Sequence, residues 1–171
     1  AIATDPADPE PYIGLALGYS NAGHAAGTGE DAANLAKAYA LKAIELDPEE
    51  AHPSLADAHV VLATRYLYTE WDFVKAEYHL KRAIALNPNS PAAHYTYGWY
   101  LALPGKINEA ADEMRKAAAI DPLDPICPGY LAWLYLWIGQ YEDAEKEAMN
   151  TLKVNPDYPM AYYVLGLSYA G

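Results

Sequence analysis

The hexapeptide AIELDP at residues 43–48 decides the fold, because the chain repeats this ending along its length. AIALNP at residues 83–88 is almost the same, AIATDP occupies residues 1–6, and looser copies end at Pro122 and Pro156. The five closing prolines are separated by 42, 40, 34 and 34 residues. Two successive gaps of equal length indicate an internal repeat, and the longer gaps indicate the same repeat with insertions.

The residues before each closing proline predict a helix that ends there. Small or apolar side chains stand five, eight and twelve residues before the proline, and steps of three and four residues share one helix face. These positions are Ala36, Ala40 and Ala43; Ala76, Leu80 and Ala83; Ala110, Met114 and Ala117; and Ala144, Ala148 and Thr151. Because proline cannot continue a helix and disfavours helical backbone just before it, each helix is predicted to stop at Asp-Pro or Asn-Pro.

Another helix is predicted after each proline, where four residues recur with steps of three, one and three. The sets are Tyr12, Leu15, Ala16 and Tyr19; His59, Leu62, Ala63 and Tyr66; His94, Tyr97, Gly98 and Leu101; Pro128, Leu131, Ala132 and Tyr135; and Tyr162, Leu165, Gly166 and Tyr169. The unit ending at Pro88 has five extra residues in EEAHPSLADA and one more before Ala76. The unit ending at Pro48 has eight extra in NAGHAAGTGED. Every unit is therefore a pair of helices.

Composition excludes several classes of protein. With 53% hydrophobic and 20% charged residues, the 171-residue chain is not broadly disordered. A net charge of −12 disfavours binding to nucleic acid or to an anionic membrane. The single cysteine, Cys127, excludes an internal disulfide framework. Sixteen tyrosines and four tryptophans beside one phenylalanine suit surfaces that are partly buried or that bind something.

This pattern resembles the tetratricopeptide repeat, in which a large residue, Leu-Gly or Leu-Ala, and Tyr mark the first helix. Ala, an aromatic or large residue, and Ala, followed by Pro, mark the second helix. The resemblance covers essentially the whole chain. It implies an all-α fold, an α-solenoid of helical hairpins wound into a right-handed superhelix, with a concave groove lined by the first helices. The chain departs from the family at Ala40, Leu80, Met114 and Ala148, where an aromatic residue is usual, and at Pro128, which opens a first helix.

The resemblance assigns the chain to a single array. Residues 1–8 end a truncated repeat, 9–50 form a repeat with a loop insertion near 21–31, 51–90 form one with an extended turn, 91–124 and 125–158 form two regular repeats, and 159–171 form a further first helix. We interpret the sequence as a fragment of a longer array. Its long first loop, the turn ELDPEEAHPSLADAH and the block YTEWDFVKAEYHLKRAIALNP are similar to repeat segments of larger bacterial signalling proteins, such as winged-helix transcription regulators and Ser/Thr kinases. In such proteins the array would be a sensory or docking module.

The implied groove is aromatic and nearly uncharged. Its predicted lining is Ile13, Leu17 and Asn21 in the first repeat, Val60, Thr64 and Tyr68 in the second, Tyr95, Thr96, Trp99 and Leu103 in the third, Tyr130, Trp133 and Trp137 in the fourth, and Tyr163 and Leu167 in the last helix. A groove that holds an acidic chain end uses Lys and Arg, and these positions have neither. We therefore expect the groove to bind an apolar or proline-rich segment of a protein or peptide partner. Packing against neighbouring helices, self-association, and binding of a small ligand or sugar are the alternatives.

No catalytic or metal site is predicted. The five histidines (His24, His52, His59, His79 and His94) lack a metal-binding spacing, and His59 and His94 occupy packing positions of first helices. The glycine-rich stretch NAGHAAGTGEDAAN lacks the Gly-Lys-Ser/Thr ending of a phosphate loop. We expect a non-catalytic scaffold without a cofactor, with a protein or peptide partner and neither nucleic acid nor membrane as a ligand.

Overall fold

The computed structural model describes residues 5–25 and 29–169, and these residues form helices and short turns without a strand. The elements are α1 (Glu10–Ala25), α2 (Gly29–Leu46), α3 (Leu55–Arg65), the π-helical turn η1 (Tyr66–Glu70), α4 (Phe73–Leu86), α5 (Pro91–Ala102), α6 (Ile107–Ile120), α7 (Ile126–Trp137), α8 (Tyr141–Val154) and α9 (Pro159–Ser168). This order confirms the all-α prediction, with a first and a second helix in each repeat.

The insertion near 21–31, which we expect to form a loop, is mostly helical. Helix α1 continues to Ala25 and α2 begins at Gly29, so the extra residues lengthen both helices. Longer helices satisfy the backbone hydrogen bonds of the inserted residues, which a long loop would leave to solvent. The expected loop residues 26–28 lie outside the described part of the chain.

The Asp-Pro and Asn-Pro pairs form turns, and four of the five directly follow the second helices α2, α4, α6 and α8. In four of the five, a side-chain oxygen of Asp or Asn accepts the backbone N–H two residues later, at 2.9 to 3.2 Å: Asp5 to Ala7, Asn87 to Asn89, Asp121 to Leu123, and Asn155 to Asp157. Asp47, which starts the lengthened turn, accepts the N–H of His52 instead, at 3.0 Å. The Asp or Asn side chain therefore stabilises the turn by a hydrogen bond, while the following proline prevents the helix from continuing. These two roles explain why the pair recurs.

The core follows the predicted register. All twelve positions of the second helices that the repeat predicts to be buried have exposed fractions of 3% or less. Close helix packing also requires a small residue in the first helix: a Cβ placed on Gly98 would lie 2.7 Å from Cγ of Met114 and 3.0 Å from the carbonyl oxygen of Ala110.

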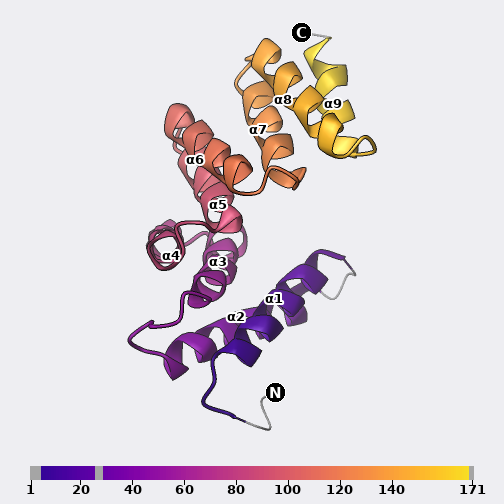
Figure 1. Ribbon diagram of the computed structural model, residues 1–171. Coiled ribbons are helices and arrows are strands. Elements are labelled where there is room, and N and C mark those ends of the chain that lie inside the picture. The colour runs from indigo at the N-terminus through magenta and orange to yellow at the C-terminus, as the bar shows by residue number, and fades with distance from the viewer. Residues whose placement is uncertain (1–4, 26–28, 170–171) are drawn as a thin grey trace. The chain divides into compact units, whose positions relative to one another are not determined.

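The chain forms two compact units, divided between Thr96 and Tyr97 within α5. In the first unit, α1 pairs with α2 and α3 pairs with α4, and α3 packs against both helices of the preceding hairpin. Figure 1 shows the α1–α2 hairpin in indigo and purple. In the second unit, α7 pairs with α8, and α9 packs against both of them, as the orange and yellow helices of Figure 1 show. Each unit thus stacks helical hairpins in chain order, the packing of an α-solenoid.

Each first helix with a regular turn ends on a glycine in the left-handed backbone region, Gly105 (φ 86°) and Gly139 (φ 74°). The backbone N–H of the residue after each glycine donates to the carbonyl five residues earlier. Lys106 donates to Leu101 at 3.0 Å, and Gln140 donates to Tyr135 at 2.9 Å. In the second repeat the equivalent residue is Trp71, with φ 56°.

The backbone N–H of Asp72, the residue after Trp71, donates to the carbonyl of Tyr66 at 3.0 Å. This bond spans six residues, whereas the corresponding bonds at the regular turns span five. The one inserted residue that the repeat count requires before Ala76 is therefore accommodated by widening the last turn of the first helix into η1.

Candidate functional site

Helix α7 presents three aromatic side chains on one face. Tyr130, Trp133 and Trp137 are three and four residues apart, which places them on one side of the helix. Trp133 is 37% exposed and Trp137 is 57% exposed. Leu131 and Leu134 of the same helix are buried in the core of the second unit. The helix therefore divides its apolar residues between the core and an exposed surface.

The neighbouring first helices extend this surface. Trp99 of α5 meets Tyr130 with ring centroids 5.7 Å apart and an interplanar angle of 88°. Trp133 meets Tyr163 of α9 at 6.0 Å and 34°. Tyr163 is 54% exposed, and Leu167, one turn later on α9, is 42% exposed. We call these six side chains the aromatic face: Trp99, Tyr130, Trp133, Trp137, Tyr163 and Leu167.

The helices that carry the aromatic face contain no Asp, Glu, Lys or Arg at all. The charged residues of the second unit lie on α6, on α8 and in the turns, where Arg115 bonds to Asp112 and Lys116 to Glu113 within α6. Arg115 also donates to the hydroxyl of Tyr135 on α7 at 2.6 Å, on the buried side of that helix. The chemistry available on the aromatic face is therefore ring stacking, together with donation from tyrosine O–H and indole N–H groups.

The predicted lining residues of the first unit are placed differently. Val60 is 8% exposed and packs with Ala56, Ala83 and Ala93. The hydroxyl of Thr64 donates to the carbonyl of Val60 at 2.9 Å.

Tyr95 of the first unit is partly buried, while Ile13 is 3% exposed and Thr96 is 2% exposed. Tyr68 is exposed, with 48% of its surface accessible. The structure thus brings Trp99, Tyr130, Trp133 and Tyr163 of the second unit into ring contacts. In the first unit it buries Ile13, Val60 and Thr96 and leaves the other predicted residues partly buried or exposed.

An exposed apolar cluster surrounds η1, and the sequence analysis did not predict it. Trp71 is 64% exposed, Val74 is 81% exposed, and the rings of Trp71 and Phe73 meet edge to face at 6.2 Å. The unusual signal in the sequence is the inserted residue before Ala76, since it turns the end of α3 outward as a π-helical turn.

The first unit also holds a pair of histidines, of which His59 is buried and His79 is partly buried. Nδ1 of His59 and Nδ1 of His79 lie 2.8 Å apart, so one ring donates and the other accepts. Nε2 of His59 lies 3.4 Å from Oε1 of Glu50, and the other oxygen of that carboxylate, Oε2, accepts hydrogen bonds from Arg82. The burial of His59 and His94 confirms their predicted packing roles.

Aromatic and cationic groups complete the surroundings of the pair. Tyr66 stacks on His79 at 5.5 Å, and the ring of Tyr78 meets both histidines edge-on. The ammonium groups of Lys37 and Lys75 lie 4.8 and 5.2 Å from the centre of the Tyr66 ring. Burial lowers the pKa of His59, and burial together with repulsion by His59 lowers the pKa of His79 to about 4. Both rings are consequently neutral near pH 7.

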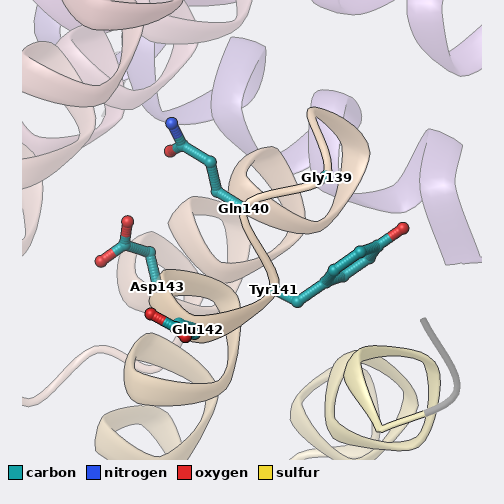
Figure 2. Close-up of a pocket in the computed structure, with 5 residues that line it drawn as sticks. All are labelled: Gly139, Gln140, Tyr141, Glu142 and Asp143. Atoms are coloured by element: carbon teal, nitrogen blue, oxygen red, sulfur yellow. The ribbon is translucent and has the colours of Figure 1, made fainter.

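An open hollow of about 350 Å³ lies at the turn between α7 and α8, lined by Gly139, Gln140, Tyr141, Glu142 and Asp143. Figure 2 shows Tyr141 pointing to the side opposite Gln140 and Asp143. These are consecutive, exposed residues of one turn, without a buried polar group directed into the hollow. We therefore place the candidate site on the aromatic face.

Metal ligation and thiol chemistry have no candidate site in the described residues. No group of three or more His, Cys, Asp and Glu side chains in residues 5–25 and 29–169 is arranged to hold a metal ion. Cys127 is 1% exposed, and burial raises the pKa of its thiol to about 12. Across the same ranges, none of the helices combines the length and the hydropathy that a membrane crossing requires.

Residues 101–166, which include most of the aromatic face, match the family model of the tetratricopeptide repeat. A TPR repeat-containing thioredoxin of Arabidopsis thaliana, TTL4, is 32% identical over 84 residues, which make up 49% of this chain and 12% of that protein. The chain thus spans only a small part of this curated relative.

Solved structures extend the likeness to nearly the whole chain. Pseudomonas aeruginosa pilF is similar with a TM-score of 0.75 and 26% identity, over 97% of this chain and 69% of pilF. TTC0263, a TPR protein of Thermus thermophilus, is similar with a TM-score of 0.71 and 22% identity, over 99% of this chain and 86% of that protein. Taken with the stacked helical hairpins, these matches show that residues 101–166 contain tetratricopeptide repeats and that the described chain has the fold of a tetratricopeptide repeat protein.

Proposed function

We propose that this protein is a non-catalytic interaction scaffold whose aromatic face binds an uncharged, apolar or proline-rich segment of a partner protein. The tetratricopeptide repeat fold is consistent with a protein-interaction scaffold. The observation that carries the finer proposal is the exposure of Trp133, Trp137 and Tyr163 side by side on helices without charge. Exposed aromatic clusters of this kind mark binding surfaces in soluble proteins.

The absence of charge decides between classes of peptide. A carboxylate or phosphate group would need Lys or Arg on the binding surface, and α5, α7 and α9 supply neither. A charged segment would lose its hydration against these rings without gaining a counter-charge. An apolar or proline-rich segment avoids this cost, and proline-rich chains also lose little conformational entropy on binding.

The test is isothermal titration calorimetry of a panel of peptides: proline-rich, apolar without proline, acidic and basic. We expect uncharged peptides to bind with dissociation constants of order micromolar, about −8 kcal/mol. The variant carrying both Trp133→Ala and Tyr163→Ala should bind at least tenfold more weakly, which is about 1.4 kcal/mol. Trp71→Ala is the matched control, because Trp71 is more exposed than Trp133 and lies in the other unit. Unchanged binding by the double variant would exclude the aromatic face.

Self-association is a second candidate, favoured by α9. Tyr162 and Tyr163 of this helix are 57% and 54% exposed, and Tyr169, directly after it, is 70% exposed. Sedimentation velocity from 1 to 100 µM tests this function. If the sedimentation coefficient rises with concentration, and Tyr162→Glu with Tyr169→Glu abolishes the rise, then α9 is an interface between copies.

A further inference from the structure

We propose that the aromatic face contacts its partner in steps of three residues, with each repeat holding one turn of a polyproline II helix. This inference rests on the proposed function of the aromatic face as a peptide-binding surface. It adds the conformation of the peptide, its direction across the helices, and the spacing of its prolines.

The first observation is that a tryptophan recurs at the same position of two successive repeats, each time in contact with a tyrosine. Trp99 and Trp133 both stand eleven residues after a closing proline, Pro88 and Pro122. Each pairs with a tyrosine of the following first helix, Tyr130 at 5.7 Å and Tyr163 at 6.0 Å between ring centroids. The two pairs differ in ring orientation, with interplanar angles of 88° and 34°, but have similar centroid distances. The surface therefore contains two ring niches of similar spacing, one between α5 and α7 and one between α7 and α9.

The second observation is the separation of the niches. Helices α7 and α9 pack directly on one another. Directly packed helices have axes about 8–10 Å apart, so successive niches are separated by about that distance. A polyproline II helix rises about 3.1 Å per residue with three residues per turn, so one turn advances about 9.3 Å. A peptide that crosses the first helices in this conformation places equivalent side chains in successive niches.

Other peptide conformations fit this spacing less well. A β-strand rises about 3.3 Å per residue, so residues three apart span about 10 Å but point to opposite faces. Residues two apart share a face but span only about 6.6 Å. An α-helical ligand would need about six residues for the same advance, and residues six apart do not lie on one helix face.

The chemistry of the niches also suits proline. A pyrrolidine ring stacks on the face of an indole or a phenol, and its backbone lacks an N–H that burial would leave unsatisfied. The carbonyls of a polyproline II helix make no internal hydrogen bonds, so they are free to accept from tyrosine O–H and indole N–H groups. The charge-free helices neither attract nor require charged residues in the peptide.

The test uses ten-residue peptides of one composition, two prolines in an Ala/Gln background, with the prolines two, three or four residues apart. In calorimetric titrations of the full chain, the peptide with three-residue spacing should bind at least tenfold more tightly than the other two. Occupation of both niches by one peptide makes the second contact intramolecular, which is the source of the difference. A peptide with a single proline provides the one-niche reference.

Variants test each niche separately. Trp133→Ala should abolish the preference for three-residue spacing and lower the affinity to that of the one-proline peptide. Trp99→Leu, which keeps an apolar side chain at a partly buried position, should do the same, and circular-dichroism melting verifies that both variants are folded. Trp71→Ala should keep the preference, since it leaves both niches intact.

Four outcomes would overturn the inference. Equal binding at all three spacings refutes the three-residue register, and equal binding of a peptide with leucine in place of both prolines refutes the preference for polyproline II. Either result leaves the aromatic face as a peptide site. If Trp133→Ala leaves the binding of every peptide unchanged, or if no peptide binds the native chain, the proposed function fails as well.

Discussion

At the scale of single residues, Gly98 and Gly166 occupy the same place in the repeat, ten residues after Pro88 and Pro156. Their surroundings are opposite. A Cβ at Gly98 would meet Met114 at 2.7 Å and the carbonyl of Ala110 at 3.0 Å, whereas a Cβ at Gly166 would meet nothing within 4 Å. The repeat alone predicts the same role for both glycines, and only the neighbouring helix distinguishes them.

We therefore predict opposite effects of the same substitution. Gly98→Ala should lower the free energy of unfolding by about 1–3 kcal/mol, because the new methyl group must displace α6 or the Met114 side chain. Gly166→Ala should raise it by up to about 1 kcal/mol, because alanine favours helix over glycine. Urea unfolding followed by circular dichroism measures both, and the same sign for both variants would contradict the close packing of Gly98.

The pair formed by the buried His59 and the partly buried His79 predicts how stability depends on pH. Both pKa values are lower in the folded state than the usual value near 6.5. The unfolded chain therefore binds protons first, so the stability contributed by the neutral pair is present above pH 6.5 and is lost between there and about pH 4. We expect the free energy of unfolding to fall by roughly 1–2 kcal/mol between pH 7 and pH 5.

His79→Asn tests the role of the pair, because its amide reaches about as far as Nδ1 but does not titrate. The fall in stability should shrink in this variant. The exposed His52 acts in the opposite direction, since a hydrogen bond to Asp47 raises its pKa. In the control variant His52→Asn, the free energy of unfolding should fall between pH 7 and pH 5 by the same amount or by more. An unchanged fall in His79→Asn would assign the pH dependence to other groups.

At the scale of elements, the sequence predicts the helices well because each carries its own signals. The second helices reveal their buried face through positions such as Ala76, Leu80 and Ala83, and their ends through the Asx-Pro turn. The sequence does not predict which side chains of different helices contact one another. The pairing of His59 with His79, twenty residues away, and the burial of Val60 both depend on how closely α3 and α4 pack.

The turn after α3 is a second feature that the sequence does not predict. The repeat count requires one extra residue before Ala76, and the structure accommodates it as a π-helical turn with Trp71 in the left-handed region. A left-handed backbone costs about 1–2 kcal/mol for a residue with a Cβ. Neither the place of the extra residue nor the strained tryptophan is evident from spacing alone.

This backbone geometry predicts a pair of substitutions. Gly139→Ala should lower the free energy of unfolding by about 1–2 kcal/mol, since alanine would have to adopt φ near 74°. Trp71→Gly relieves similar strain but loses the edge-to-face contact with Phe73, worth about 0.5–1.5 kcal/mol, so it should change stability by less than about 1 kcal/mol. Thermal melting compares the two variants. A large loss in Trp71→Gly would show that its contacts outweigh the backbone strain.

At the scale of the whole molecule, charge and aromatic surface are segregated. The chain carries a net charge of −12, yet α5, α7 and α9 contain no ionisable acid or base apart from His94 and the hydroxyls and thiol of Tyr and Cys. The sequence predicts this segregation, because the first helices can be identified from the repeat. It does not predict the division into two compact units, which falls within α5 between Thr96 and Tyr97 without a proline, glycine or change of composition at that point.

The segregation predicts that binding of an uncharged peptide depends little on salt. Dissociation constants at 50 and 500 mM NaCl should agree within about twofold, because short-range stacking is not screened. The same peptide with three added glutamates outside the proline segment should bind more weakly at 50 mM than at 500 mM, since the acidic protein repels it at long range. A strong salt dependence for the uncharged peptide would indicate that ionic contacts contribute to binding.

The burial of Cys127 has a practical consequence for this protein. A thiol that is 1% exposed, with its pKa raised to about 12, forms almost no thiolate at neutral pH, and thiolate is the form that reacts with maleimides. The native chain should consequently remain unlabelled in its folded form. A cysteine introduced at an exposed turn position such as Asn89 would then be the one site that accepts a dye or spin label, without removal of the native cysteine.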